Sequence, residues 1–182
     1  MTAPAFPDMA NIKKRLLIED DIVAAVSSLT AGSDDPRILI SISRSLLASS
    51  SVVEDLKEQL HGQIIGVVSV LTEHTPYDKV FELANEITSS KATHLLSIGG
   101  GSVIDGGKIA LLAANLQIRD AEALEELASS LGKTKDIATW PIQHIAVPTT
   151  LSGAEFTPIA GATSSITGRK TGFSHAFLLP DN

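Results

Sequence analysis

Hydrophobic and polar positions follow two different periods along the chain, and these periods predict where its strands and helices lie. Four short apolar runs bounded by polar or turn-forming residues are typical of buried strands. The runs cover residues 37–43, 63–70, 93–99 and 141–148. Because a strand buried in a parallel sheet is apolar on both faces, the sheet is expected to carry helices on both sides.

Apolar residues spaced three or four positions apart fill the intervals between these runs, as expected of amphipathic helices. They predict one helix over residues 45–61, a second with Thr75 as N-cap and Pro76 as its first residue, a third over Gly101–Asn115 and a short acidic helix over residues 120–131. This alternation predicts an α/β fold with an open, mainly parallel sheet and helices on both faces.

The chain changes character after Pro148, where threonine, serine and glycine replace the long apolar runs. Two glycine-containing turns, "SITGR" and "KTGFS", lie between short apolar stretches and predict a small β-hairpin near the C-terminus. We therefore expect one α/β domain over residues 1–182. It comprises an N-terminal extension with the first helix (1–36), a sheet core (37–150) and a polar loop with the hairpin (151–182).

Composition limits the partners of this domain. Only 4% of the 182 residues are aromatic while 43% are hydrophobic, so Leu, Ile, Val and Ala build the core. A net charge of −7 without a basic patch argues against nucleic acid and against an anionic membrane. The absence of cysteine excludes disulfides and thiolate chemistry. With neither a secretory signal nor a membrane span in view, we expect a soluble, cytoplasmic protein.

The stretch "LLSIGGGSVIDGGK" (95–108) places three glycines between a predicted strand and a predicted helix. Free N–H groups and the positive end of the helix dipole favour an anion at such a turn, and glycines let a phosphate approach the backbone. Gly99, Gly100, Gly101 and Ser102 are therefore candidate phosphate ligands. A tight turn that merely requires glycine is the alternative, because short glycine motifs occur by chance.

A second polar strand end favours the ligand-binding interpretation. The predicted strand 141–148 leads into Thr149, Thr150 and Ser152, whose hydroxyl groups can line a crevice. Since the carboxyl ends of parallel strands meet at one edge of a sheet, two polar ends indicate a shared cleft rather than two unrelated loops.

Several motifs together resemble the iron-containing alcohol dehydrogenase superfamily over about residues 37–182. They are "GGGSVIDGGK" (99–108), "PTTLSGAEFTP" (148–158), and Lys170 eight residues before "LLP" (178–180). The segments "EHTP" (73–76) and "GAEFTPIAG" are most similar to the maleylacetate reductase branch. The resemblance implies a Rossmann-like domain that binds NAD or NADP and takes part in hydride transfer to a small carbonyl substrate.

The resemblance also implies a set of cofactor-binding residues. The glycine loop would hold the pyrophosphate, with Asp105 supporting it, and the threonine-rich loop would contact the adenine and ribose. Lys170 and Thr157 would flank the nicotinamide ribose. An arginine stands where an acidic residue often selects NAD, so NADP remains open, although a merely solvated cation is equally compatible. The set is Ser43, Arg44, Gly99, Gly100, Gly101, Ser102, Asp105, Thr149, Thr150, Ser152, Thr157 and Lys170.

The sequence departs from the family in its metal site. The resemblance implies that family members continue into a helical domain whose aspartate and three histidines bind Fe²⁺ or Zn²⁺. We expect no counterpart of these ligands within residues 1–182, and because the five histidines lack ligand spacing, no metal is expected in this chain. His74, Lys170 and His175 are the candidate catalytic residues, as acid or base. His144 lies in a predicted strand and is expected to be a satisfied core residue.

A second departure lies near the N-terminus. The family usually has a glycine-rich turn near residues 16–26, whereas Glu19, Asp20 and Asp21 occupy it here. We expect these acidic residues to cap and charge the start of a helix that begins near Ile22. They also make that wall of the crevice less favourable to phosphate.

Three functions remain open on this basis. The first is the NAD(P)-binding half of an oxidoreductase whose catalytic half is supplied by a separate partner. The second is a repurposed domain that catalyses a non-redox step such as an isomerisation, dehydration or cyclisation. The third is a non-catalytic binding or oligomerisation module, with "AFLLP" (176–180) and the predicted hairpin exposed as an apolar patch. All three take a small-molecule ligand or a protein partner, and either a homodimer or a separate catalytic-domain partner is expected.

Overall fold

The computed structural model describes residues 17–18, 21–133, 137 and 142–181. Its centre is a parallel sheet of four strands in the order β2-β1-β3-β4. The strands are β1 (Ile38–Ile42), β2 (Ile64–Val68), β3 (His94–Gly99) and β4 (Gln143–Pro148). The expected open, parallel α/β sheet is therefore confirmed.

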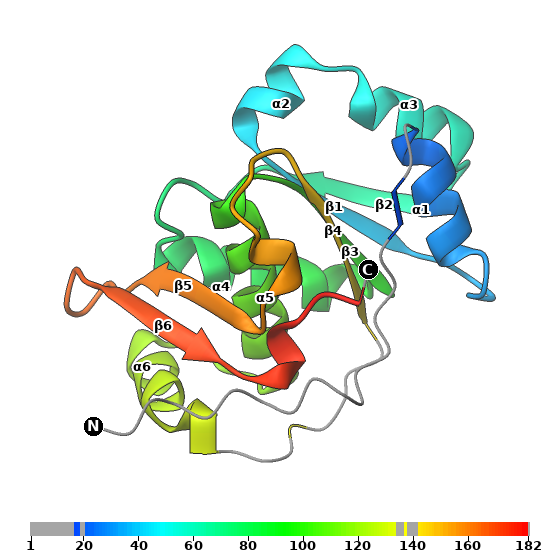
Figure 1. Cartoon of the computed structure of the whole chain (residues 1–182). Helices are drawn as coiled ribbons and strands as arrows, with labels where there is room; N and C mark the ends of the chain where they lie inside the picture. The colour runs from blue at the N-terminus through cyan, green and yellow to red at the C-terminus, as the bar shows by residue number, and fades with distance from the viewer. Residues whose placement is uncertain (1–16, 19–20, 134–136, 138–141, 182) are drawn as a thin grey trace.

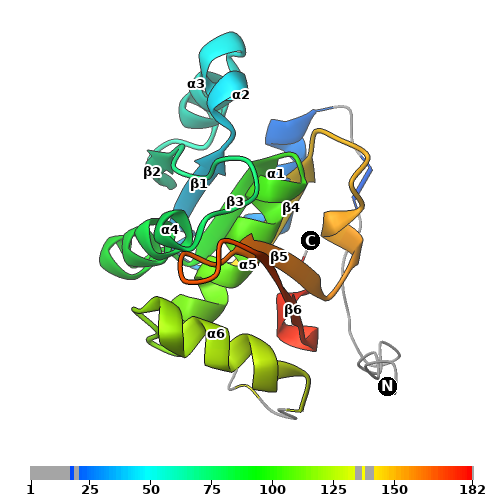
Figure 2. The same cartoon turned by 90° about the vertical axis from the view of Figure 1, so that its left-hand side faces the viewer.

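Helices cover both faces of this sheet (Figures 1 and 2). One face carries α1 (Ile22–Thr30) and α3 (Val52–Gln59), and the other carries α4 (Tyr77–Ser90) and α5 (Gly101–Asn115). The acidic helix α6 (Ala121–Ser130) lies farther out, against the C-terminal hairpin.

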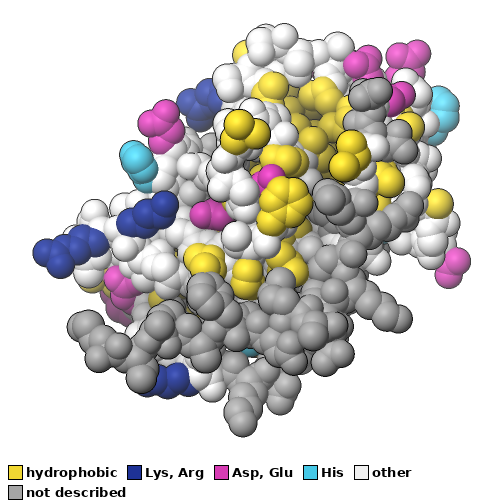
Figure 3. All heavy atoms as spheres, in the orientation of Figure 1, with side chains coloured by type: hydrophobic (Ala, Val, Ile, Leu, Met, Phe, Trp, Pro, Cys, Tyr) yellow, Lys and Arg dark blue, Asp and Glu magenta, His cyan; other side chains and the backbone are white. Residues whose placement is uncertain are grey.

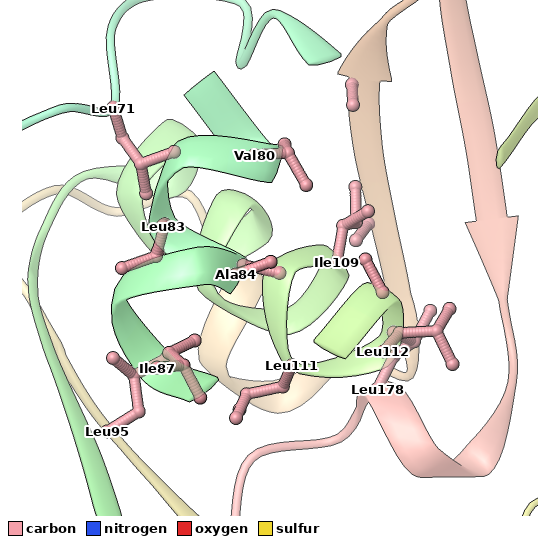
Figure 4. Close-up of a cluster of buried hydrophobic side chains, with 14 of the residues drawn as sticks. Leu71, Val80, Leu83, Ala84, Ile87, Leu95, Ile109, Leu111, Leu112 and Leu178 are labelled. Carbon is pink, nitrogen blue, oxygen red and sulfur yellow. The ribbon is translucent and has the colours of Figure 1, made fainter. Parts of the chain in front are cut away.

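The alternation of side chains along β1 separates two cores. Ile38, Ile40 and Ile42 pack with α1 and α3, whereas Leu39 points into the cluster formed with α4 and α5. Figure 4 shows this second cluster, in which leucine and isoleucine side chains from α4 and α5 meet Leu95 of β3. Burial of these aliphatic side chains, each worth about 1.5–3 kcal/mol, fixes both helices on the sheet that they cover.

The prediction of one continuous helix over residues 45–61 is wrong. The structure forms α2 (Arg44–Ser49) and α3, and Ser50 between them is extended at φ −135° and ψ 155°. The Ser49 and Ser50 hydroxyls each donate to a carbonyl four residues earlier, at 2.8 Å. Such local serine bonds favour helix ends over helix interiors, so the serine run interrupts the helix.

The predicted start of α4 is wrong by one residue. Pro76 is the N-cap, and α4 begins at Tyr77. Thr75 instead has a left-handed backbone with φ 51°, and its hydroxyl donates to the Ser102 carbonyl at 3.1 Å. A tertiary contact with α5 therefore uses the hydroxyl that a local cap would have used.

The hairpin near the C-terminus consists of β5 (Ile159–Thr163) and β6 (Lys170–Ser174), paired antiparallel. The segment "SITGR" forms its turn, where Gly168 has φ 67°. The segment "KTGFS", expected as a second turn, is strand β6 itself, because Phe173 is fully buried and holds the segment against the core. On the outer side, the α6 carboxylate of Glu125 accepts bonds from the Tyr77 hydroxyl at 2.7 Å and the Thr171 hydroxyl at 3.1 Å.

Three short 3₁₀ turns complete the described chain, over Leu131–Lys133, Ala154–Phe156 and Ala176–Leu178. At the N-terminal side, the Asp21 carboxylate caps α1 by accepting from the Val23 N–H at 2.8 Å, as expected. The expectation for Glu19 and Asp20 falls outside the described residues. No described helix is both long and apolar enough to cross a bilayer.

Candidate functional site

The strand order creates a crevice at the carboxyl ends of β1 and β3. The chain turns outward to β2 after β1 and to β4 after β3, so the connections diverge at the boundary between these two strands. Such a switch point is where open parallel sheets bind ligands. The Ser43 N–H donates to the Ile98 carbonyl at 3.1 Å, and the Thr149 N–H donates to Gly99 at 3.0 Å. The polar ends of three strands therefore meet at one edge.

The glycine loop forms the floor of this crevice. Gly100 is the N-cap of α5, and the Val103 and Ile104 N–H groups bond back to its carbonyl. Gly101 and Ser102 precede these internally bonded residues, in the turn where backbone N–H groups lack helical acceptors and the dipole is positive. The loop can therefore present N–H donors to an anion.

Glycine at Gly100 and Gly101 allows a close approach between loops and is not needed for a left-handed backbone, since neither residue has a positive φ. A Cβ on Gly100 would lie 3.2 Å from the Thr150 methyl carbon, and one on Gly101 would lie 3.1 Å from the Ser152 Cβ. The loop after β4 thus lies directly against the loop after β3. The two polar strand ends that the sequence singled out do meet.

Two cavities open on either side of this loop, with volumes of about 750 Å³ and 640 Å³. Gly101 and Ser102 line both of them. The larger cavity lies between α5 and the hairpin and is also lined by His74, Asp105, Ser152, Thr157, Gly161 and Lys170. The smaller lies toward β1 and is also lined by Ser43, Arg44, Glu73, Gly100 and Thr150.

His74 enters the larger cavity from a loop that the fold holds in an unusual shape. His74 and Thr75 have consecutive left-handed angles, φ 64° and φ 51°. The His74 carbonyl accepts a hydrogen bond from the Thr163 hydroxyl at 2.8 Å, and the Thr75 carbonyl accepts one from the Thr163 N–H at 3.0 Å. Non-glycine residues adopt this conformation only when the surroundings enforce it, so β5 fixes the position of the exposed His74.

Lys170 borders the same cavity from the first position of β6. Its aliphatic stem lies across Gly161 on the neighbouring strand, where any Cβ would collide with it. Gly161 also donates its N–H to the Asp105 carboxylate at 3.0 Å. Burial raises the pKa of Asp105, against the opposing effects of this bond and of the positive charges on Lys108 and Lys170.

The structure does not bring every predicted residue to the cavities. Thr149 continues the β3–β4 ladder, and Gly99 is buried against Val103, so neither is among the residues that line them. His175 starts the last 3₁₀ turn, where its Nδ1 accepts the Phe177 N–H at 3.1 Å, and it also lies outside both cavities. His144 is 4% exposed and bonds Ser97 at 2.9 Å, the satisfied core histidine that was expected.

Sequence reasoning missed Lys108, which is fully buried beneath the larger cavity. Its ammonium group donates to the carbonyl oxygens of Ala154, Thr157 and Ile159 at 2.6–2.8 Å. Its position three residues after Asp105 on an otherwise apolar helical face was the signal that could have found it.

Among the residues that the structure describes, no three or more histidine, aspartate or glutamate side chains gather in a way that could hold a metal ion. The described residues therefore do not fit the iron or zinc of the resembled family.

The parallel sheet with a glycine loop at its switch point is the arrangement of Rossmann-like domains. Within that class, the chain belongs to the iron-containing alcohol dehydrogenase family, since the family model described as iron-containing alcohol dehydrogenase matches residues 13–182. The predicted resemblance is confirmed.

Known proteins show how much of the family this chain represents. Dehydrogenase FUM7 of Gibberella moniliformis is 42% identical over 141 residues, which cover 74% of this chain and 33% of that protein. Maleylacetate reductase from Agrobacterium tumefaciens superposes with a TM-score of 0.69 at 23% identity, over 100% of this chain and 42% of that structure. Sulfoacetaldehyde reductase from Bifidobacterium kashiwanohense in complex with NAD⁺ superposes with a TM-score of 0.72 at 19% identity. The match covers 87% of this chain and 40% of that structure. The chain spans well under half the length of these proteins.

Proposed function

We propose that this chain binds one nicotinamide dinucleotide across its glycine loop and is the cofactor-binding half of an oxidoreductase. The observation that carries the proposal is the position of Gly101 and Ser102, which line two cavities at once. A dinucleotide has two nucleoside halves joined by a diphosphate, so it suits two cavities joined at a helix N-terminus. The sulfoacetaldehyde reductase of similar fold is a complex with NAD⁺, which supports this choice.

The residues of this chain would bind and orient the dinucleotide. Gly101 and Ser102 would donate backbone N–H groups to the diphosphate. Ser43 and Arg44 would contact the adenosine half in the smaller cavity, and His74 and Lys170 would face the nicotinamide half in the larger one. When bound, the dinucleotide supplies the hydride for a small carbonyl substrate. Lys170, as an exposed cation, can then stabilise negative charge that develops on the substrate oxygen.

The smaller cavity favours acceptance of NADP(H). Arg44 is exposed there directly after β1, where it can pair with a ribose 2′-phosphate. Glu73 lines the same cavity, and its carboxylate would repel the 2′-phosphate. We propose that Arg44 dominates, because Ser43 and Arg44 occupy the strand end at which an acidic residue would otherwise exclude the phosphate.

Isothermal titration with NAD⁺, NADH, NADP⁺ and NADPH tests this function. Micromolar binding to the wild-type chain is expected, with a loss of about tenfold or more in Gly101→Ala, whose new methyl group would crowd Ser152 where the cavities join. Gly32→Ala is the matched control, because a Cβ there meets no atom within 4 Å. Failure of all four nucleotides to bind would refute the proposal.

A non-redox acid–base function is the second candidate. It is favoured by the placement of His74 and Lys170 on the same cavity, with the His74 backbone held in a left-handed conformation. Such strain is common where a side chain must be aimed. This candidate is distinguished by the same titration, since a repurposed cavity would bind a small metabolite but none of the four dinucleotides.

We propose that residues outside the sequence described here complete the oxidoreductase site, on a catalytic domain or on a second copy of the chain. The apolar surface available to it differs from the expected one. Leu178, Leu179 and Pro180 of "AFLLP" are buried, so that part of the prediction is wrong, because the last 3₁₀ turn packs against α5. The large hydrophobic side chains at the surface include Leu151, Phe156, Ile159 and Ile166. Figure 3 shows hydrophobic side chains gathered on one face.

A further inference from the structure

Lys108 is one of the most buried side chains of the molecule, at 1% exposure, although it carries a charge. It projects from the middle of α5 beneath the segment that joins β4 to β5. Its Nζ lies 2.6 Å from the Ala154 carbonyl oxygen and 2.8 Å from those of Thr157 and Ile159. An ammonium group has three N–H donors, so all three are used on a single stretch of backbone.

That stretch has little regular structure of its own. It contains one 3₁₀ turn, in which the Phe156 N–H bonds to Gly153 and the Thr157 N–H bonds to Ala154 at 3.3 Å. Its carbonyl groups at the three contacted positions converge on Lys108 rather than pairing in a ladder. Without the ammonium group, the Thr157 carbonyl loses this donor and the carbonyls of Ala154 and Ile159 keep only longer bonds from Thr157, at 3.3–3.4 Å, so the segment has reason to move.

The same segment is a wall of the larger cavity. Ala154, Thr157 and Ile159, whose carbonyl groups Lys108 holds, all line it. Asp105, one turn earlier on α5, holds the next part of this wall through the Gly161 N–H and lies 3.8 Å from the Lys108 ammonium group. The helix that presents Gly101 and Ser102 to the cleft therefore also fixes the opposite side of it.

We propose that Lys108 is a positioning residue, which sets the width of the larger cavity by clamping residues 154–159 to α5 without touching the ligand. The proposal rests on the proposed function for its ligand, a nicotinamide dinucleotide. The clamp itself is a property of the free protein, so the two claims can fail separately.

The absence of cysteine from the sequence permits a direct test. Lys108→Cys introduces a single thiol, which can be alkylated in denaturant with 2-bromoethylamine to rebuild a side chain of lysine length and charge. Bromoethane gives the matched control, which has the same stem without the amino group. The wild-type chain, carried through the same unfolding, alkylation and refolding, controls for the treatment.

Two readouts are expected to move together. Hydrogen exchange at amides 154–161 rises by about tenfold in the ethylated protein, the effect of losing about 1–1.5 kcal/mol of hydrogen bonding, and NADPH affinity falls by a similar factor. Both return to within about threefold of wild type in the aminoethylated protein, since the charge restores the clamp. Exchange in β1 and β3 stays unchanged in each protein.

Several results would overturn the proposal. Wild-type exchange at 154–161 in the ethylated protein would show that the ammonium group does not hold the segment. Faster exchange with unchanged NADPH affinity would show that the segment does not shape the cavity. Global unfolding of the ethylated protein would assign Lys108 to general stability. If the wild-type chain binds no dinucleotide, the proposed function fails, and the exchange measurement alone then decides the clamp.

Discussion

At the scale of single residues, Lys108 is a charged group buried inside the domain. Burial lowers the pKa of Lys108 to about 8, although the nearby Asp105 and Glu155 carboxylates act to raise it. A buried ammonium group is tolerated only when its donors are satisfied and opposite charge lies nearby. The carbonyl groups of residues 154–159 satisfy the donors, and Asp105, one turn earlier on α5, supplies the charge.

The lowered pKa of Lys108 has a definite consequence for stability. Between pH 8 and 10.5 the unfolded chain retains a proton that the folded chain has released, so the free energy of unfolding rises with pH through this group. We expect wild type to gain up to about 3 kcal/mol relative to Lys108→Met across that window. Urea unfolding of both proteins from pH 7 to 10.5 measures the difference. A constant difference would show that the folded pKa is not lowered.

Arg44 is the residue at which cofactor choice is tested. Arg44→Asp is expected to weaken NADPH binding by about tenfold or more while NADH binding changes little, because a carboxylate repels the 2′-phosphate and accepts a bond from the 2′-hydroxyl. Titration of both nucleotides gives the ratio. Arg169→Asp, with the same charge change on the hairpin turn and outside both cavities, is the control. An equal effect of the two variants would exclude a local role for Arg44.

At the scale of elements, the packing of α5 on the sheet depends on a glycine that sequence reasoning assigned to no role. A Cβ on Gly107 would lie 2.6 Å from the Ser97 hydroxyl oxygen and 3.1 Å from the His144 Nε2, which are bonded to each other. Gly107→Ala is therefore expected to destabilise the fold by about 1–3 kcal/mol. Denaturant unfolding tests this, with Gly132→Ala, in open space, as the control that stays near wild type.

The strands were predictable because a strand buried in a parallel sheet is a continuous apolar run in the sequence. The predicted helix over Gly101–Asn115 also matches α5. The missed features depend on side-chain hydrogen bonds, one set local and one between distant segments. The break at Ser50 comes from local hydroxyl bonds that compete with the helix, and the start of α4 moved because Thr75 bonds to α5 instead of capping. Neither competition is visible in hydrophobic spacing.

The candidate site could be predicted from the sequence only in part. The glycine loop and the threonine-rich loop lie after strands, and parallel strands bring their ends together, so the meeting of Gly100 with Thr150 followed from topology. The clamp of Lys108 and the fixed loop at His74 did not follow from topology. The clamp depends on Ile159 of β5 lying against α5, 51 residues away in the chain, and the His74 loop depends on Thr163 of β5, which is 89 residues away.

At the scale of the whole molecule, one helix links the cleft to the hairpin. α5 carries the glycine loop at its start, Asp105 and Lys108 one and two turns later, and packs on β3 and β5 (Figure 2). A ligand that contacts both cavities would therefore be held by parts that α5 positions together. We therefore propose that the two cavities bind one extended ligand rather than two separate small ones.

Nuclear magnetic resonance of the labelled chain during titration with NADPH tests this central claim most directly. The account predicts that the amides of Arg44 in the smaller cavity and Lys170 in the larger one shift together, along with Gly101, and saturate at one nucleotide per chain. Shifts confined to one cavity, or saturation of the two cavities at different nucleotide concentrations, would contradict the account of a single dinucleotide spanning the glycine loop.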